Sequence, residues 1–245
     1  AVPGQPAAAA APAKRERIEV KTDLYRLVFD SEGGSLIKAE LLQHIDMADK
    51  SRNFLLLDES AQRVYVAQTG LIGGSFPTHK TLMTAVPGPR ELQDGQDAIT
   101  VRFESPEQGG LKLVKTWTIQ RGAYDIAVRH EVVNTGNVAV SPQLYLQLVR
   151  DGNPPPGESS FYSTFTGPAV FTDAKKYQKV DFKDIENGKV DIPRDSPNGY
   201  VAMVQHYFAT AWLLADGVQR ELFTRKVDTN LYSVGMLTSL GTIEP

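Results

Sequence analysis

The side chains best suited to acid–base or metal chemistry are four histidines, His44, His79, His130 and His206, which are well separated along the chain. None has a second histidine or a glutamate at the short spacings that bind zinc. His130 lies on the apolar side of an alternating segment and His206 inside a long apolar one, so both are predicted to be hydrogen-bonded core or cleft residues. His79 adjoins Lys80 in an irregular stretch and is predicted to be solvated. The histidines therefore predict no metal site and no catalytic residue.

Other catalytic and cofactor-binding patterns are also missing. There is no Gly-x-Ser-x-Gly nucleophile motif, and Gly33-Gly34 lacks the third glycine and the helix of a dinucleotide site. The absence of cysteine excludes disulfides, thiolate metal sites and a cysteine nucleophile. Asp181, Asp184 and Glu186 are predicted to belong to a solvated turn. The sequence thus favours a binding or structural module without a cofactor over an enzyme.

The charge of the chain gives no reason to expect a nucleic-acid partner. Its net charge is −3, and no basic cluster is interleaved with aromatic residues. The densest basic run, Lys14, Arg15 and Arg17, is interrupted by Glu16 and is predicted to be a solvated tether. Residues 1–13 are rich in alanine and proline and cannot bury enough surface to offset their ordering entropy. We therefore expect residues 1–17 to be a linker.

The dominant signal after Ile18 is period two, which is typical of half-buried strands. Ile99, Val101 and Phe103, for example, alternate with polar residues. The segments predicted as strands are Leu24–Phe29, Ser35–Leu42, Phe54–Asp58, Arg63–Thr69, Ile99–Phe103, Leu111–Gln120, Tyr124–Val132, Val138–Val149, Glu221–Val227 and Leu231–Leu237.

The arrangement of these segments predicts an all-β fold. The first two are expected to form a hairpin, and the three between Leu111 and Val149 an antiparallel meander because short turns join them. Residues 70–97 are predicted to be a long irregular connection, and Lys183–Asn187 a single helical turn. So many strands with so little helix favour two antiparallel sheets packed face to face.

The segment from Gly199 to Leu214 is apolar on both faces, so it is predicted to be covered on all sides. It is shorter than the ~20 apolar residues of a membrane-spanning helix. We expect Val201–Val204 and Ala209–Leu214 to be central strands with a bend near Gln205 and His206.

Four segments follow one another along residues 18–245: VKTDLYRLVFDSEGGSLIKAELL at 20–42, KTWTIQRGAYDIAVRHEVVNTG at 115–136, FTGPAVFTDAKKYQKVDFKDI at 165–185 and GYVAMVQHYFATAW at 199–212. Together and in this order they resemble the large periplasmic domain of the YidC membrane-protein insertases of Gram-negative bacteria.

This resemblance implies a periplasmic β-supersandwich of galactose-mutarotase-like topology. Residues 1–17 would link it to a missing N-terminal membrane helix, and the chain would stop before the last strand and a helical linker. The domain would act as a non-catalytic accessory of an inner-membrane insertase, would be a monomer, and would contact SecD–SecF, other Sec translocon components and nascent membrane proteins. The insertase groove would lie outside this chain, so no functional residue carries over.

Two other functions remain open from the sequence. The fold implied by the resemblance also occurs in carbohydrate-binding and mutarotase-like proteins, in which His130 or His206 would need a carboxylate within reach across a groove. A free periplasmic chaperone-like binder is the third reading, and it predicts no hydrophobic spans elsewhere in the gene.

Overall fold

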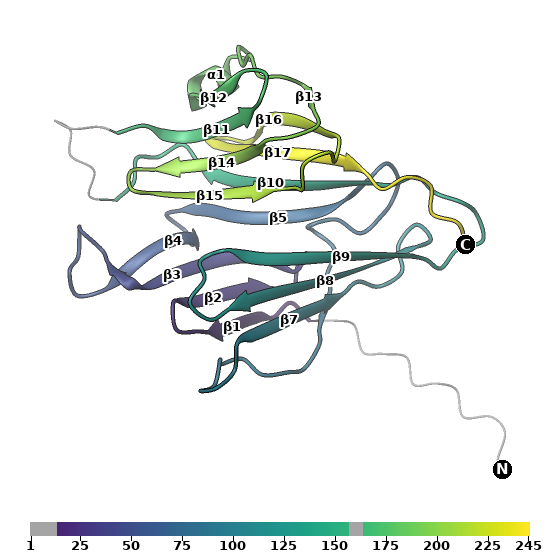
Figure 1. The fold of residues 1–245 in the computed structure, drawn as a ribbon, viewed down its shortest axis with the longest axis horizontal. Helices are drawn as coiled ribbons and strands as arrows, with labels where there is room; N and C mark the ends of the chain where they lie inside the picture. Colours follow the sequence, from purple (N-terminus) through teal and green to yellow (C-terminus); the bar gives the residue numbers. More distant parts are fainter. Residues whose placement is uncertain (1–13, 157–163) are drawn as a thin grey trace.

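The computed structural model describes residues 14–156 and 164–245, which form seventeen β-strands and one short helix (Figure 1). The strands are β1 (Arg17–Lys21), β2 (Tyr25–Asp30), β3 (Ser35–Ile45), β4 (Asn53–Glu59), β5 (Val64–Ile72), β6 (Thr84–Ala85), β7 (Ala98–Glu104), β8 (Leu111–Gln120), β9 (Ile126–Asn134), β10 (Gln143–Asp151), β11 (Thr166–Thr172), β12 (Lys176–Lys179), β13 (Asp195–Ser196), β14 (Tyr200–Gln205), β15 (Phe208–Leu213), β16 (Arg220–Asp228) and β17 (Leu231–Ser239). The helix, α1, spans Phe182–Glu186, where a single turn was expected. The all-β prediction is confirmed, and no helix of the described residues is long and apolar enough to cross a membrane.

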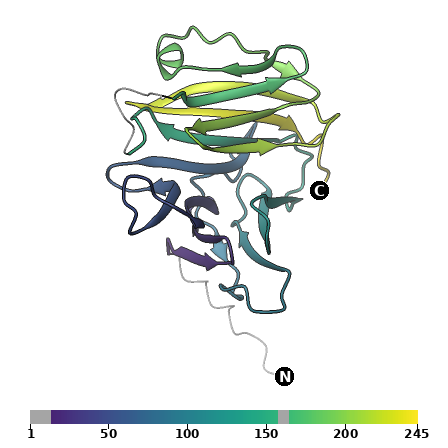
Figure 2. The same cartoon turned by 60° about the vertical axis from the view of Figure 1, so that its left-hand side comes forward.

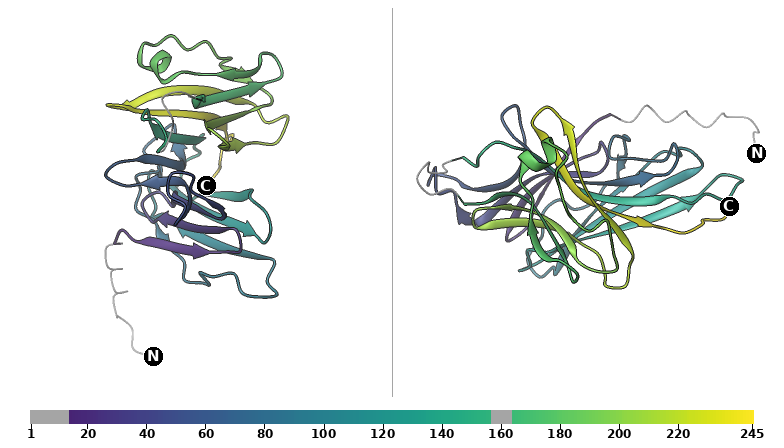
Figure 3. Two further views of the ribbon diagram at one scale, coloured as in Figure 1. Left: turned by 90° about the vertical axis from the view of Figure 1, so that its left-hand side faces the viewer. Right: turned by 90° about the horizontal axis from the view of Figure 1, so that it is seen from above.

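The strands form three antiparallel sheets. The largest has nine strands in the order β1-β2-β3-β4-β5-β10-β17-β16-β13, and two sheets of four strands have the orders β12-β11-β14-β15 and β6-β7-β8-β9. Figures 1 and 2 show the sheet of β11, β12, β14 and β15 beside β10, β16 and β17 at one end of the molecule, and the sheet of β6 to β9 beside β1–β3 at the other end. The left view in Figure 3 separates the two ends, with residues 165–239 in green to yellow above the purple to teal strands. The small sheets together cover the large one.

The largest hydrophobic cluster joins the three sheets. It includes Phe29 of β2, Phe103 of β7 and Trp117 of β8, whose rings pack with centroids 5.3–6.1 Å apart. Trp117 also lies 6.0 Å from Trp212 of β15, so both small sheets meet in the core. Period-two alternation places these side chains inward, as the sequence predicted.

One predicted connection is wrong. The third strand of the expected meander starts at Gln143 rather than Val138, and it leaves β9 to enter the nine-stranded sheet between β5 and β17. Pro142 has no backbone N–H to donate to a ladder, and Val140 instead bridges Ile243. The meander that does form consists of β7, β8 and β9. Strand β10 is largely buried on both faces because it lies in the middle of the largest sheet.

The segment from Gly199 to Leu214 forms the expected pair of strands, β14 and β15, with a turn at His206. Strand β14 is largely buried, but β15 is the terminal strand of its sheet and exposes alternate residues. Leu213 has 67% of its surface exposed. The predicted burial on both faces is therefore wrong for β15, because apolarity alone does not distinguish an edge strand from a central one.

The N-terminal part of the chain largely follows the sequence prediction. Strands β2 and β3 form the expected hairpin, with both turn glycines in left-handed conformations (φ 74° for Gly33 and 57° for Gly34). The connection at 70–97 is irregular apart from the end of β5 and the two residues of β6. The linker expected over 1–17 has its first thirteen residues outside the described part, and Arg17 already belongs to β1.

Candidate functional site

A lysine lies in the core where β8 crosses β5 and the β2–β3 turn. The side chain of Lys115 is fully buried, and its Nζ donates to the carbonyl oxygens of Gly33 at 2.5 Å and Thr69 at 2.6 Å. Burial lowers the pKa of Lys115 to about 7. Both acceptors are backbone carbonyls rather than carboxylates. Through these two hydrogen bonds, Lys115 links two elements of the nine-stranded sheet to β8 of a four-stranded sheet.

The neighbouring tryptophan reinforces this attachment. Trp117 is the next inward residue of β8, and its Nε1 donates to the carbonyl oxygen of Gly34 at 3.0 Å. The same turn also packs closely against the connection that contains His79, because Gly33 has no side chain: a Cβ there would lie 2.3 Å from the carbonyl oxygen of His79. Two successive inward residues of β8 therefore hold two successive carbonyls of one turn.

His130 completes a group of four residues, Gly33, Thr69, Lys115 and His130, which we call the Lys115 cluster. The Nε2 of His130 lies 2.7 Å from the hydroxyl of Thr69. Burial, followed by the charge of Lys115, lowers the pKa of His130 to about 3, so its imidazole is neutral near pH 7. His130 is hydrogen-bonded, as predicted for a core or cleft residue, and it is half-buried.

His79 lies next to this cluster and is half-buried, so the prediction that it is solvated is wrong. Its backbone N–H donates to the hydroxyl of Tyr145 at 2.8 Å, and its Nδ1 lies 2.5 Å from the same oxygen. Burial lowers the pKa of His79 to about 4 and raises that of Tyr145 to about 12. A Cβ on Gly70 would lie 2.3 Å from the Tyr145 hydroxyl, so that glycine makes room for the contact.

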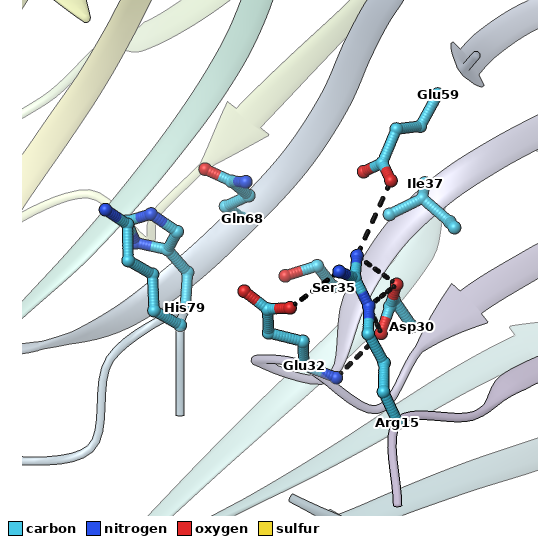
Figure 4. Close-up of a pocket in the computed structure, with 9 residues that line it drawn as sticks. Arg15, Asp30, Glu32, Ser35, Ile37, Glu59, Gln68 and His79 are labelled. Carbon is cyan, nitrogen blue, oxygen red and sulfur yellow. Dashed lines mark hydrogen bonds and ion pairs between the residues drawn. The ribbon is translucent and has the colours of Figure 1, made fainter. Parts of the chain in front are cut away.

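A polar pocket of about 160 Å³ lies beside His79 on the nine-stranded sheet (Figure 4). The guanidinium of Arg15 sits among three carboxylates, 2.7 Å from Asp30, 2.9 Å from Glu32 and 3.6 Å from Glu59. The Asp30 side chain is only 2% exposed, and its hydrogen bond raises the pKa of Arg15. Arg15 is therefore part of the folded domain and not of a solvated tether.

His206 is far less enclosed than predicted. It occupies an exposed turn with φ 50°, and its Nδ1 lies 2.8 Å from the Thr164 hydroxyl. Neither His130 nor His206 forms an ion pair with a carboxylate within residues 14–156 and 164–245. In the same residues, no three His, Cys, Asp or Glu side chains gather in a way that could hold a metal ion.

Sequence reasoning did not single out Lys115 or Tyr145, and it assigned Arg15 to a solvated tether. The signal for Lys115 is present, because it falls in register with the inward residues Leu113 and Trp117 of its strand. A lysine at an inward position of a strand indicates a buried cation with dedicated acceptors. Arg15 carries no comparable signal, since its partners lie 15 to 44 residues away in sequence.

The buried histidines make folding sensitive to acid. Between about pH 3 and pH 6.5 the unfolded chain binds a proton at His130 that the folded chain does not, so the free energy of unfolding is highest above pH 6.5 and falls as the pH drops. At pH 5 this costs about 2 kcal/mol for His130. Urea denaturation of wild type and His130→Gln at pH 7 and pH 5 measures the difference.

The matched control is His206→Gln, which alters an exposed turn and is expected to keep the wild-type pH dependence. Equal pH dependence of wild type and His130→Gln would contradict the assignment of a buried neutral imidazole.

Comparison with known proteins covers nearly the whole chain. The family model described as the YidC periplasmic domain matches residues 17–245. The chain is 47% identical to a membrane protein insertase YidC of Janthinobacterium sp. (strain Marseille) over 96% of its length, and 49% identical to that of Bordetella parapertussis over 95%. It spans 41–42% of the length of these two relatives.

A solved structure extends the comparison to the fold alone. The galactose mutarotase related enzyme from Lactobacillus acidophilus superimposes with a TM-score of 0.51 at 10% sequence identity, over 93% of this chain and 86% of that one. The galactose-mutarotase-like fold expected from the sequence is therefore confirmed.

Proposed function

Because the chain belongs to the YidC periplasmic-domain family, we propose that it is the periplasmic accessory domain of an inner-membrane protein insertase. It assists the insertion and folding of inner-membrane proteins by protein–protein contact and not by catalysis. The observation that carries this proposal is the match to the family model over residues 17–245. The partners we propose are SecD–SecF, other components of the Sec translocon and nascent membrane proteins, with the domain itself a monomer.

The interior of the domain supports a non-catalytic role. His130 is bonded to a hydroxyl and has its pKa lowered to about 3, so it is a weak base. The acids of the pocket are engaged by Arg15. Mutarotation needs an acid and a base free to exchange protons across an open groove. The alternative of a mutarotase-like or carbohydrate-binding protein has only the fold in its favour, and a fold does not determine a function.

The proposal is tested in the full-length insertase by deleting residues 18–245 and measuring insertion of a model inner-membrane protein into membranes. We expect a reduced rate or yield of insertion with the membrane-embedded part still folded, because an accessory domain modulates the reaction without performing it. Loss of all insertion together with unfolding of the membrane part would contradict an accessory role. Polarimetry of galactose with the purified chain checks the alternative, for which we expect no acceleration of mutarotation.

A further inference from the structure

The terminal strands of the three sheets differ in how their free edges are protected from pairing with a strand of another chain. Strand β15 pairs only with β14, along its whole length from Phe208 to Leu213, so its other side is unpaired in its sheet. Its sequence, FATAWL, contains no charged residue. Native proteins usually protect such an edge with charges, proline, a bulge or a covering segment, because the free N–H and C=O groups are a template for another strand.

The other terminal strands carry such protection. Strand β1 has Arg17, Glu19 and Lys21, and its edge is also covered at Lys21 by backbone hydrogen bonds to Arg90 and Leu92. Strands β9 and β12 contain charged residues, and β6 and β13 are only two residues long. Among the strands in the described ranges, β15 is thus the one terminal strand longer than two residues without a charge.

The inward side chains of β15 hold it in place. Phe208 stacks on Phe54 of β4 with ring centroids 4.2 Å apart, and the Thr210 hydroxyl lies 2.7 Å from that of Tyr65. Trp212 donates its Nε1 to the carbonyl oxygen of Gln147 at 2.9 Å. Three consecutive inward residues are therefore anchored to the large sheet, so the edge is preorganised and loses little entropy when another strand pairs with it.

The outward side chains leave the edge accessible. Ala209 and Ala211 are small and exposed, so no long side chain folds over the backbone. Exposed apolar groups stand at the two ends of the strand, Tyr207 with 79% and Leu213 with 67% of their surfaces accessible. A strand laid along this edge would find backbone partners in its middle and apolar contacts at both ends.

We propose that the free edge of β15 is a β-augmentation site that captures an extended, uncharged segment of a client polypeptide. A row of unpaired backbone groups matches the spacing of another extended backbone, which favours a peptide over a lipid or a sugar as the ligand of this edge. An uncharged segment fits because alanines and exposed apolar groups offer no partner to a charge. This inference rests on the proposed function, for which the client is a segment of a membrane protein that has not yet folded.

The size of the edge favours a transient client over a second copy of the chain. Six residues extend over only about 20 Å. The surface buried along one strand of this length is far smaller than the ~1,200–2,000 Å² of total surface that a stable protein–protein interface buries. Brief capture and release suits a protein that handles unfolded segments, whereas a permanent dimer would need further contacts.

The test measures peptide binding to the purified 245-residue chain by fluorescence anisotropy. The probe is a labelled peptide, Gly-Ser-Val-Thr-Val-Thr-Val-Thr-Ser-Gly, compared with the same peptide N-methylated at alternate residues so that one edge loses its donors. Ala211→Lys places a charge on the proposed edge, and Ala127→Lys is the matched control at an exposed alanine of β9. Far-UV circular dichroism and thermal melting verify that both variants fold.

We expect the unmodified peptide to bind, and binding to weaken at least tenfold with Ala211→Lys or with N-methylation but not with Ala127→Lys. Equal binding of both peptides, or no effect of Ala211→Lys, would overturn the proposal. Concentration-dependent dimers that Ala211→Lys abolishes, without peptide binding, would also overturn it in favour of self-pairing. Because peptide binding is measured without the insertase, its failure is distinguishable from failure of the deletion experiment above.

Discussion

Gly199→Ala is expected to destabilise the protein more than any other single methyl addition at its turns. Gly199 has φ +91°, and a Cβ there would lie 1.9 Å from the carbonyl oxygen of Phe171 on the neighbouring strand. The atom that the Cβ meets belongs to the backbone and cannot rotate away, so β11 and β14 would have to separate, and β14 is a central strand of its sheet. We expect a loss on the order of 4 kcal/mol in the free energy of unfolding, measured by urea denaturation.

Gly217→Ala is the matched control. Gly217 has φ +84°, but a Cβ there would meet nothing within 4 Å. Its substitution therefore adds only the left-handed backbone penalty of about 1–2 kcal/mol. Equal losses in the two variants would show that the contact with Phe171 contributes nothing beyond backbone strain.

Lys115→Met is expected to cost about 3 kcal/mol at pH 7. Methionine fills a similar volume but cannot donate, so the carbonyl oxygens of Gly33 and Thr69 lose the partner that they share in the core. The loss has a pH dependence of known sign. Because the folded-state pKa is lowered from 10.5 to about 7, the unfolded chain binds more protons between those values, and wild-type stability rises with pH across that window.

The free energy of unfolding of Lys115→Met lacks this rise, so the difference in free energy of unfolding between wild type and variant should widen from pH 7 to pH 10. Urea denaturation at pH 7, 8.5 and 10 measures it, with Lys112→Met as a control on the exposed face of the same strand. A gap that stays constant or narrows with pH would mean that Lys115 is not a buried group with a lowered pKa.

Much of the fold could be predicted from the sequence because strands obey a local rule. The hairpin of β2 and β3, the pair β14–β15 and the helical turn α1 each follow from alternation and turn residues within a short window. The strands that pair with β10 could not be predicted in this way. Its choice of β5 and β17 over β9 depends on partners 71 or more residues away, measured from Ile72 to Gln143.

The polar interior was harder to predict than the strands. The hydrogen bonding of His130 was anticipated because β9 alternates. Lys115 falls at an inward position of β8 by the same rule, but sequence reasoning did not single it out. The state of His79 depends on the hydroxyl of Tyr145, which is 66 residues away. Arg15 depends on three carboxylates from separate elements, and His206 on the position of a turn within an apolar run. Each of these is decided by tertiary contacts that a single sequence does not encode locally.

The order of the large sheet has a consequence for the timing of folding. Strand β10 is completed at Asp151, yet one of its two neighbours, β17, begins at Leu231. While the chain is being made, about 80 residues must follow β10 before its second edge can be closed, and synthesis at ~5–20 residues per second makes that an interval of several seconds. Throughout that time one edge of a strand that is largely buried in the finished sheet presents unpaired backbone groups. The domain therefore cannot finish folding from its N-terminal end, and it is itself a nascent chain in need of protection until its last strand emerges.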